Sequence, residues 1–138
     1  MSNTAVYNPL DSILKLDVMK ACNFVSGHSI KAAIEELPGS RKDRLVQYFN
    51  LLYCFGLDMF THGSVSAKAS IGVLQGCPLS LFVFCLALSP ALSAAASFLP
   101  ANGVNAYPDD CTLQGLSSAI VRAFQAFTDT AAKAHLYP

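Results

Sequence analysis

Apolar residues recur along the chain at two different spacings, and the changes of spacing divide the sequence into predicted elements. Apolar residues three or four positions apart are typical of helices, and short runs rich in Ile, Leu and Val are typical of strands. The predicted helices span residues 26–36, 41–55, 79–96 and 116–136, the predicted strands span 12–19, 103–107 and 111–115, and a predicted β-hairpin spans 59–71. This mixed order predicts an α+β fold with helices on one face of an antiparallel sheet.

Two of the predicted helices have a clear apolar side that is suited to packing on a core. The helix over 41–55 carries Leu45, Val46, Phe49, Leu52 and Tyr53 on one face. The helix over 116–136 carries Ile120, Phe124 and Phe127 on one face. Such faces predict amphipathic helices that cover a sheet or another helix.

The composition indicates one domain with an unusually apolar surface. The 138 residues suffice for a single domain with its own core. Hydrophobic residues make up 53% and charged residues 13%, whereas about 25% charged residues is usual in globular proteins. We therefore expect part of the surface to contact further protein. Nine basic residues balance nine acidic ones, so net charge gives no indication of nucleic-acid binding.

The cysteines and the N-terminal residues favour an intracellular protein. The five cysteines are odd in number and show no Cys-x-x-Cys spacing, which argues against a zinc ribbon and against a secreted disulfide framework. Residues 1–12 lack the basic and apolar regions of a signal peptide. We expect a reducing compartment, either nucleus or cytoplasm.

A long stretch without charge, residues 69–108, raises the alternative of a small membrane-associated protein. Its segment 79–99 has about the length of a transmembrane helix. The segment contains four serines and one proline, however, and no cluster of Lys or Arg flanks it closely. The favoured interpretation is a helix buried on most sides in a larger core.

Two adjacent carboxylates, Asp109 and Asp110, follow this stretch in the sequence NAYPDDCTLQG. On spacing alone, a solvated turn explains such a pair most often. The alternative is a cation site: Asp17 lies on another predicted strand, and if the two strands are neighbours its carboxylate can converge with that of Asp109. Converging carboxylates repel each other unless a cation lies between them, and oxygen ligands suit Mg²⁺ or Mn²⁺.

Three ordered motifs resemble the palm of reverse transcriptases, above all those of non-long-terminal-repeat retrotransposons and group II introns. The first is an Asp followed by a run ending in Ala-Phe-Asn, which is matched by Asp17, Ala21, Cys22 and Asn23. The second is Gln-Gly-x-Pro-Leu-Ser, matched by Gln75, Gly76, Cys77, Pro78, Leu79 and Ser80. The third is Tyr-x-Asp-Asp, matched by Tyr107, Pro108, Asp109 and Asp110. The resemblance implies that residues 1–138 are a single partial reverse-transcriptase domain, with a polymerase palm core over about 12–127.

The resemblance also implies an activity, RNA-directed DNA polymerisation by two Mg²⁺ or Mn²⁺ ions. Asp17 and Asp109 would ligate both ions, and Asp110 would flank the site and support its metal or primer geometry. The ions would activate the primer 3′-hydroxyl and stabilise charge on the α-phosphate. The implied partners are an RNA template, a DNA primer, deoxynucleoside triphosphates and the fingers and thumb segments of a longer polyprotein, and a membrane is not expected.

Four further residues receive roles in nucleotide and template binding from the same resemblance. Gln75 and Gly76 would lie beside the templating base and the incoming nucleotide, and Tyr107 would pack beneath the primer end. Cys22 stands where the family carries an aromatic residue against the sugar. A simpler interpretation exists for three of them: Gly76 as a loop residue with free φ, Tyr107 as a core aromatic and Gln75 as a surface residue.

Several departures from the family pattern bear on activity. Cys22 is small where the family has Phe or Tyr, Pro108 removes a backbone N–H, and Leu81 stands where a second Pro often follows. The fingers ahead of the first motif and the thumb behind the third are expected to be largely absent. We therefore expect the isolated chain to be inactive, and a non-catalytic remnant of a degenerate retroelement is the main alternative.

Overall fold

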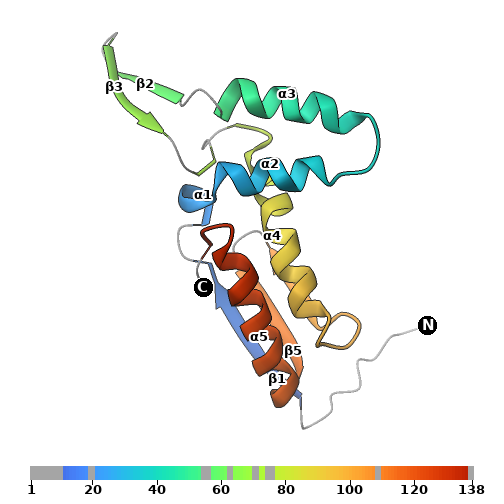
Figure 1. Cartoon of the computed structure of the whole chain (residues 1–138). Coiled ribbons are helices and arrows are strands. Elements are labelled where there is room, and N and C mark those ends of the chain that lie inside the picture. The colour runs from blue at the N-terminus through green and yellow to red at the C-terminus, as the bar shows by residue number, and fades with distance from the viewer. Residues whose placement is uncertain are drawn as a thin grey trace, which may run out of the picture.

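The computed structural model describes residues 11–18, 21–53, 57–61, 64–69, 72–73, 77–107 and 110–136. Its elements follow in the order β1 (Asp11–Asp17), α1 (Ala21–Phe24), α2 (Gly27–Glu35), α3 (Arg41–Tyr53), β2 (Leu57–Thr61), β3 (Ser64–Ala69), α4 (Ser80–Ala96), β4 (Val104–Tyr107), β5 (Asp110–Leu116) and α5 (Ser117–Ala132). Figure 1 shows a sheet with α4 and α5 at one end of the molecule, and α2, α3 and the β2–β3 hairpin at the other.

Three antiparallel strands form the larger sheet, in the order β1-β5-β4. The central strand β5 pairs with β1 along its full length, so that Asp17 at the end of β1 lies opposite Asp110 at the start of β5. On the other side of β5, Tyr107 at the end of β4 is also paired with Asp110. Strands from the two ends of the sequence therefore lie side by side.

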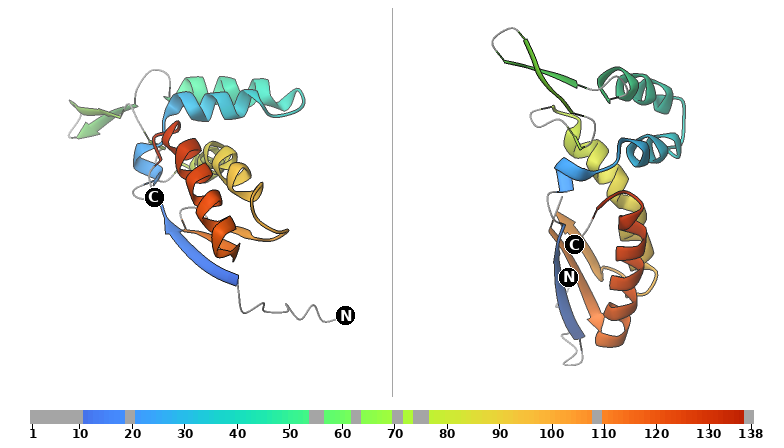
Figure 2. Two further views of the ribbon diagram at one scale, coloured as in Figure 1. Left: turned by 60° about the horizontal axis from the view of Figure 1, so that its bottom comes forward. Right: turned by 60° about the vertical axis from the view of Figure 1, so that its left-hand side comes forward.

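Helices α4 and α5 lie on one face of this sheet and leave the other face open (Figure 2, right). Side chains of a strand alternate between the two faces. Cys111 and Leu113 of β5 are fully buried, as is most of Leu16 on β1. Asp110 and Asp17, which alternate with them, are exposed. The core thus lies between the sheet and the two helices, and the carboxylates lie on the open face.

Small residues allow α4 and α5 to pack closely against each other. Ala87, Ala91 and Ala95 recur every fourth residue of α4, which places them on one side of the helix, and all three are buried. Phe84 of α4 and Phe127 of α5 are fully buried in the same core. Burial of each such large apolar side chain contributes about 1.5–3 kcal/mol, so this helix pair is a main source of stability.

The second end of the molecule packs on α4 through α2, which contacts both α3 and α4. Ile30 and Ile34 of α2 are fully buried, and Phe49 of α3 is buried in the same cluster. Strands β2 and β3 pair only with each other and form a separate two-stranded sheet.

The structure confirms the α+β prediction and most of the predicted elements. The β-hairpin forms as expected, although its strands begin at Leu57 and the turn at residues 62–63 lies outside the described residues. Two corrections are needed. The hairpin does not join the three-stranded sheet, and the short helix α1 was not predicted. Four residues are too few for a periodic pattern to indicate a helix.

The segment 79–99, considered above as a membrane span, contains the 17-residue helix α4. Across the described ranges, no helix is both long enough and apolar enough to cross a membrane. The expectation of burial on most sides was too strong. One side of α4 is buried, whereas Leu81 and Phe82 on the other side are exposed.

Candidate functional site

The open face of the three-stranded sheet carries the candidate site. Alternate residues of each strand reach this face. They are Ile13, Lys15 and Asp17 of β1, Asp110, Thr112 and Gln114 of β5, and Asn105 and Tyr107 of β4. The face combines two carboxylates, one ammonium and several uncharged polar groups, and no helix of the described chain covers it (Figure 2, right).

Asp17 and Asp110 are direct cross-strand partners at one end of this face. Side chains in such positions project in parallel from Cα atoms about 4.5–5.5 Å apart. Both residues are exposed, so their side chains are accessible to solvent and to ions. Carboxylate oxygens are ligands that suit hard divalent cations such as Mg²⁺ or Mn²⁺, which keep several waters. The pair supplies two such ligands, and the metal site stays a prediction.

The third predicted carboxylate, Asp109, lies outside the described residues, as do Gln75 and Gly76. Among the residues that the structure does describe, no three His, Cys, Asp or Glu side chains form a group that could hold a metal ion. The structure thus places two of the three predicted acidic residues together, and the position of Asp109 stays a prediction.

Tyr107 extends the site across β5, because it is paired with Asp110 on the side opposite β1. Its side chain is 82% exposed. The interpretation of Tyr107 as an aromatic that fills the core is therefore wrong. An exposed ring beside a carboxylate presents both an apolar face and a hydroxyl to any molecule that docks on the sheet.

Lys15 is the residue of this face that sequence reasoning missed. Its Nζ lies 3.2 Å from Oδ1 of Asp110, and the two side chains are 68% and 50% exposed. The sequence did indicate its position, because Lys15 stands two residues before Asp17 on a predicted strand. Side chains two residues apart on a strand project from the same face. The chain thus supplies its own cation to the carboxylate pair.

Two backbone hydrogen bonds join the segment just ahead of the second motif, Gly72 and Val73, to residues 22–25. The backbone N–H of Val73 donates to the carbonyl of Cys22 at 2.7 Å, and that of Gly72 donates to the carbonyl of Val25 at 3.0 Å. Gly72 has φ of +83°, and a Cβ on it would lie 2.5 Å from the carbonyl oxygen of Asn23. Only glycine fits at position 72. The contact therefore holds residues 72–73, which precede Gln75 and Gly76 in the sequence, against residues 22–25.

Cys22 itself is half-buried and packs against the hydrophobic core from α1. Its backbone carbonyl, which accepts the hydrogen bond from Val73, ties this residue to the segment just ahead of the second motif. The segment at Gly72 and Val73 is therefore positioned relative to α1, which begins at Ala21, four residues after the end of β1 at Asp17.

The second motif also contains a thiol with altered acidity. The hydroxyl of Tyr48 on α3 lies 3.5 Å from Sγ of Cys77, just ahead of α4. Hydrogen bonding from Tyr48, and next from the backbone N–H of Leu79, lowers the pKa of the Cys77 thiol. By contrast, burial raises the pKa of the Cys85 thiol on α4. Cys77 is thus the more readily ionised of these two cysteines.

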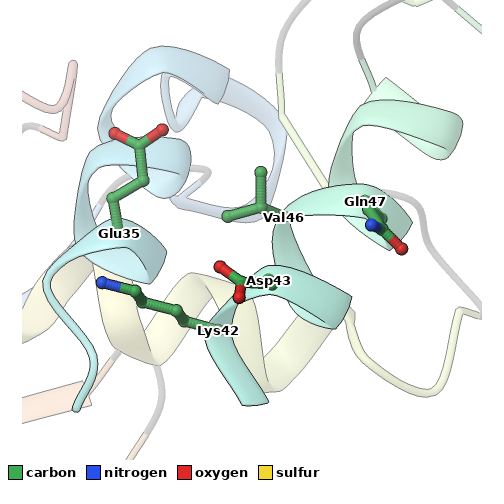
Figure 3. A pocket seen from close by; sticks show the side chains of 5 residues that line it. All are labelled: Glu35, Lys42, Asp43, Val46 and Gln47. Atoms are coloured by element: carbon green, nitrogen blue, oxygen red, sulfur yellow. The ribbon is translucent and has the colours of Figure 1, made fainter. Parts of the chain in front are cut away.

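A hollow of about 370 Å³ lies between α2 and α3, away from the open sheet face (Figure 3). Glu35, Lys42, Asp43, Val46 and Gln47 line it. Its two carboxylates and one ammonium give a mixed surface with no single charge preference, and no residue of the three motifs belongs to it.

Comparisons with known proteins give no family for the chain: no protein-family model matches the sequence, and no curated protein is significantly similar to it.

Proposed function

We propose that this chain is the palm segment of an RNA-directed DNA polymerase, in which Asp17, Asp109 and Asp110 hold two divalent ions. The observation that carries the proposal is the direct pairing of Asp17 with Asp110 on the open sheet face. These residues belong to the first and third motifs, which lie at opposite ends of the sequence. Their juxtaposition is what a shared metal site requires.

Further support comes from the contact between the first and second motifs. The hydrogen bonds of Val73 and Gly72 to the segment 22–25 tie the chain before Gln75 to the chain after Asp17. The first and third motifs are thus joined through the pairing of β1 with β5, and the residues just ahead of the second motif are joined to the segment 22–25. A site that must hold a nucleotide between metal ligands and template needs such links, because small displacements of reacting groups lower the rate steeply.

The expected chemistry is nucleotidyl transfer to a primer 3′-hydroxyl. Bound Mg²⁺ or Mn²⁺ ions would activate that hydroxyl and neutralise charge on the α-phosphate. Asp17, Asp109 and Asp110 hold the ions and keep the site anionic until they bind. Tyr107, exposed beside Asp110, supports the primer end, and Gln75 and Gly76 border the templating base. The substrates are an RNA template, a DNA primer and deoxynucleoside triphosphates.

The alternative is a non-catalytic remnant with the same fold, and Cys22 favours it. In the proposed polymerase this position borders the nucleotide sugar, where an aromatic ring would reject a 2′-hydroxyl. The Cys22 side chain is too small for that contact. A remnant would keep the sheet and its carboxylates but would not support polymerisation in any context.

Primer extension by a chimera tests the proposal. Residues 12–127 replace the palm of an active group II intron reverse transcriptase, and extension of oligo(dT) on poly(rA) is measured with Mn²⁺. We expect extension that disappears in the Asp109→Asn and Asp17→Asn chimeras. A folded chimera that binds primer-template but does not extend it contradicts the proposal and favours the remnant. In an active chimera, Cys22→Phe should raise the preference for deoxynucleotides over ribonucleotides.

A further inference from the structure

The ammonium of Lys15 lies on the open sheet face in direct contact with the candidate metal site. Lys15 pairs across the strands with Thr112, and its side chain reaches diagonally to Asp110, where Nζ lies 3.2 Å from Oδ1. Asp17 stands two residues further along β1 and shares the same face. One lysine therefore contacts Asp110 and projects from the same face as Asp17.

The position of Lys15 explains how the sheet accommodates two carboxylates, Asp17 and Asp110, directly opposite each other. Like charges directly opposite on a sheet repel. Of the ion pairs that the structure describes, Lys15–Asp110 lies on this face, whereas Lys31–Glu35 lies within α2. Lys15 is thus the cationic partner that the described chain offers to Asp110, beside Asp17 on the same face.

We propose that Lys15 is a built-in counter-cation that competes with the divalent ion for Asp110. The inference rests on the proposed metal site. In the metal-free state the ammonium holds Asp110, and a divalent ion that binds Asp17 and Asp110 must displace it. The ammonium then stays close to the ion and repels it. Lys15 is therefore a positioning residue that stabilises the empty site and weakens metal binding.

The exposure of the pair sets the size of the effect. Both side chains are at least half exposed, so water screens their interaction and the ion pair is easily broken. For such a pair, removal of the ammonium should tighten divalent-ion binding by about three- to tenfold at low ionic strength. The gain should shrink as salt is added, because exposed charges are screened.

Titration of the full chain with Mn²⁺ tests this inference, with free Mn²⁺ followed by its electron paramagnetic resonance signal. The variants are Lys15→Met, which keeps length without charge, Lys15→Arg, which keeps the charge, and the double variant Lys15→Met/Asp110→Asn. Urea denaturation establishes that each is folded. We expect Lys15→Met to bind Mn²⁺ about three- to tenfold more tightly than the unmodified chain. Lys15→Arg should bind Mn²⁺ within about twofold of the unmodified chain. The double variant should lose the gain in affinity that Lys15→Met shows.

Three outcomes overturn the inference. If the unmodified chain and Lys15→Met bind Mn²⁺ with equal affinity, Lys15 does not compete, although the metal site itself stands. If Lys15→Arg binds as tightly as Lys15→Met, the positive charge is not the cause. If Lys15→Met shows no saturable binding at all, the inference fails together with the metal site of the proposed function.

Discussion

Asp17 and Asp110 lie directly opposite each other in the sheet, where like charges lower stability. Selection for stability alone would favour opposite charges or apolar side chains at these two positions. Lys15 relieves part of their repulsion by pairing with Asp110. Asp17 has no comparable ion pair among the described residues. Functional groups commonly lower stability in this way, because their arrangement serves binding and not folding.

We therefore expect Asp17→Asn to stabilise the metal-free chain. Removal of one of two opposed like charges should raise the free energy of unfolding by about 0.2–1 kcal/mol, measured by urea denaturation in the presence of a chelator. The matched variant Asp110→Asn removes the repulsion and also the ion pair with Lys15, so its gain should be smaller. Lower stability for Asp17→Asn than for the unmodified chain would contradict repulsion between the two carboxylates.

The two cysteine thiols with shifted pKa values should differ in reactivity. Hydrogen bonding from Tyr48 lowers the pKa of the Cys77 thiol, whereas burial raises the pKa of the Cys85 thiol. The Cys77 thiolate should therefore form at lower pH, and alkylation of Cys77 by iodoacetamide should begin at lower pH than alkylation of Cys85. Tyr48→Phe should shift the Cys77 alkylation profile to higher pH and leave the Cys85 profile in place. Peptide mass spectrometry separates the two sites. An unchanged Cys77 profile would show that the hydroxyl does not stabilise the thiolate.

At the scale of elements, the contact between α1 and the segment just ahead of the second motif depends on Gly72. Its φ of +83° and the close approach of the Asn23 carbonyl both exclude a side chain. Gly39 offers a matched control, because its φ is +89° but a Cβ would meet nothing within 4 Å. Gly39→Ala should cost about 1–2 kcal/mol from backbone strain alone, and Gly72→Ala at least about 1 kcal/mol more. Equal losses in thermal denaturation would mean that the contact at Gly72 is not tight.

Helix α4 contains Pro90 in its interior, on an exposed position. Proline has no N–H to donate to the carbonyl four residues earlier, and its ring crowds that carbonyl. Pro90→Ala should therefore raise the free energy of unfolding by about 1–3 kcal/mol. Ser89→Ala, an exposed change on the same helix, should alter it by less than about 0.5 kcal/mol. If both variants have the same stability, the helix accommodates Pro90 without strain.

The sequence predicted the long elements well because each carries a periodic apolar pattern, as the buried positions Ile120 and Phe127 of α5 illustrate. It missed α1, which is too short for such a pattern, and the separation of the hairpin from the main sheet, which depends on packing. For the site, the motifs brought Asp17 and Asp110 to attention. Lys15 stands on the same face as Asp17 by its spacing alone, but its contact with Asp110 depends on the strand register, which the sequence does not give.

At the scale of the whole molecule, charged groups are few and exposed apolar side chains occur on several elements. Leu51 of α3, Val121 of α5 and Ile13 of β1 are each more than half exposed. Scattered exposed apolar residues are normal in soluble proteins. The expectation that further protein covers part of this surface thus stays a prediction.

Residues 1–138 alone should not extend a primer at a measurable rate. Affinity for nucleic acid depends mainly on contacts with phosphates, and nine basic residues balanced by nine acidic ones provide little attraction. The candidate site also lies on an open face, and nothing in the described chain holds a duplex against it. Primer extension with Mn²⁺ on poly(rA)–oligo(dT) checks this, beside an Asp109→Asn control. Extension that depends on Asp109 would make the chain a minimal polymerase.

The proposed polymerase function requires a divalent-ion site at Asp17 and Asp110, and paramagnetic broadening of amide signals by Mn²⁺ reports on such a site residue by residue. At substoichiometric Mn²⁺, we expect the NMR signals of Asp17, Tyr107 and Asp110 to broaden first, and Asp17→Asn to remove that selectivity. Glu35 and Asp43, the two carboxylates of the hollow between α2 and α3, provide an internal comparison. A metal site at Asp17 and Asp110 would be contradicted by equal broadening at the sheet and at the hollow. It would also be contradicted if the selective broadening persisted in Asp17→Asn.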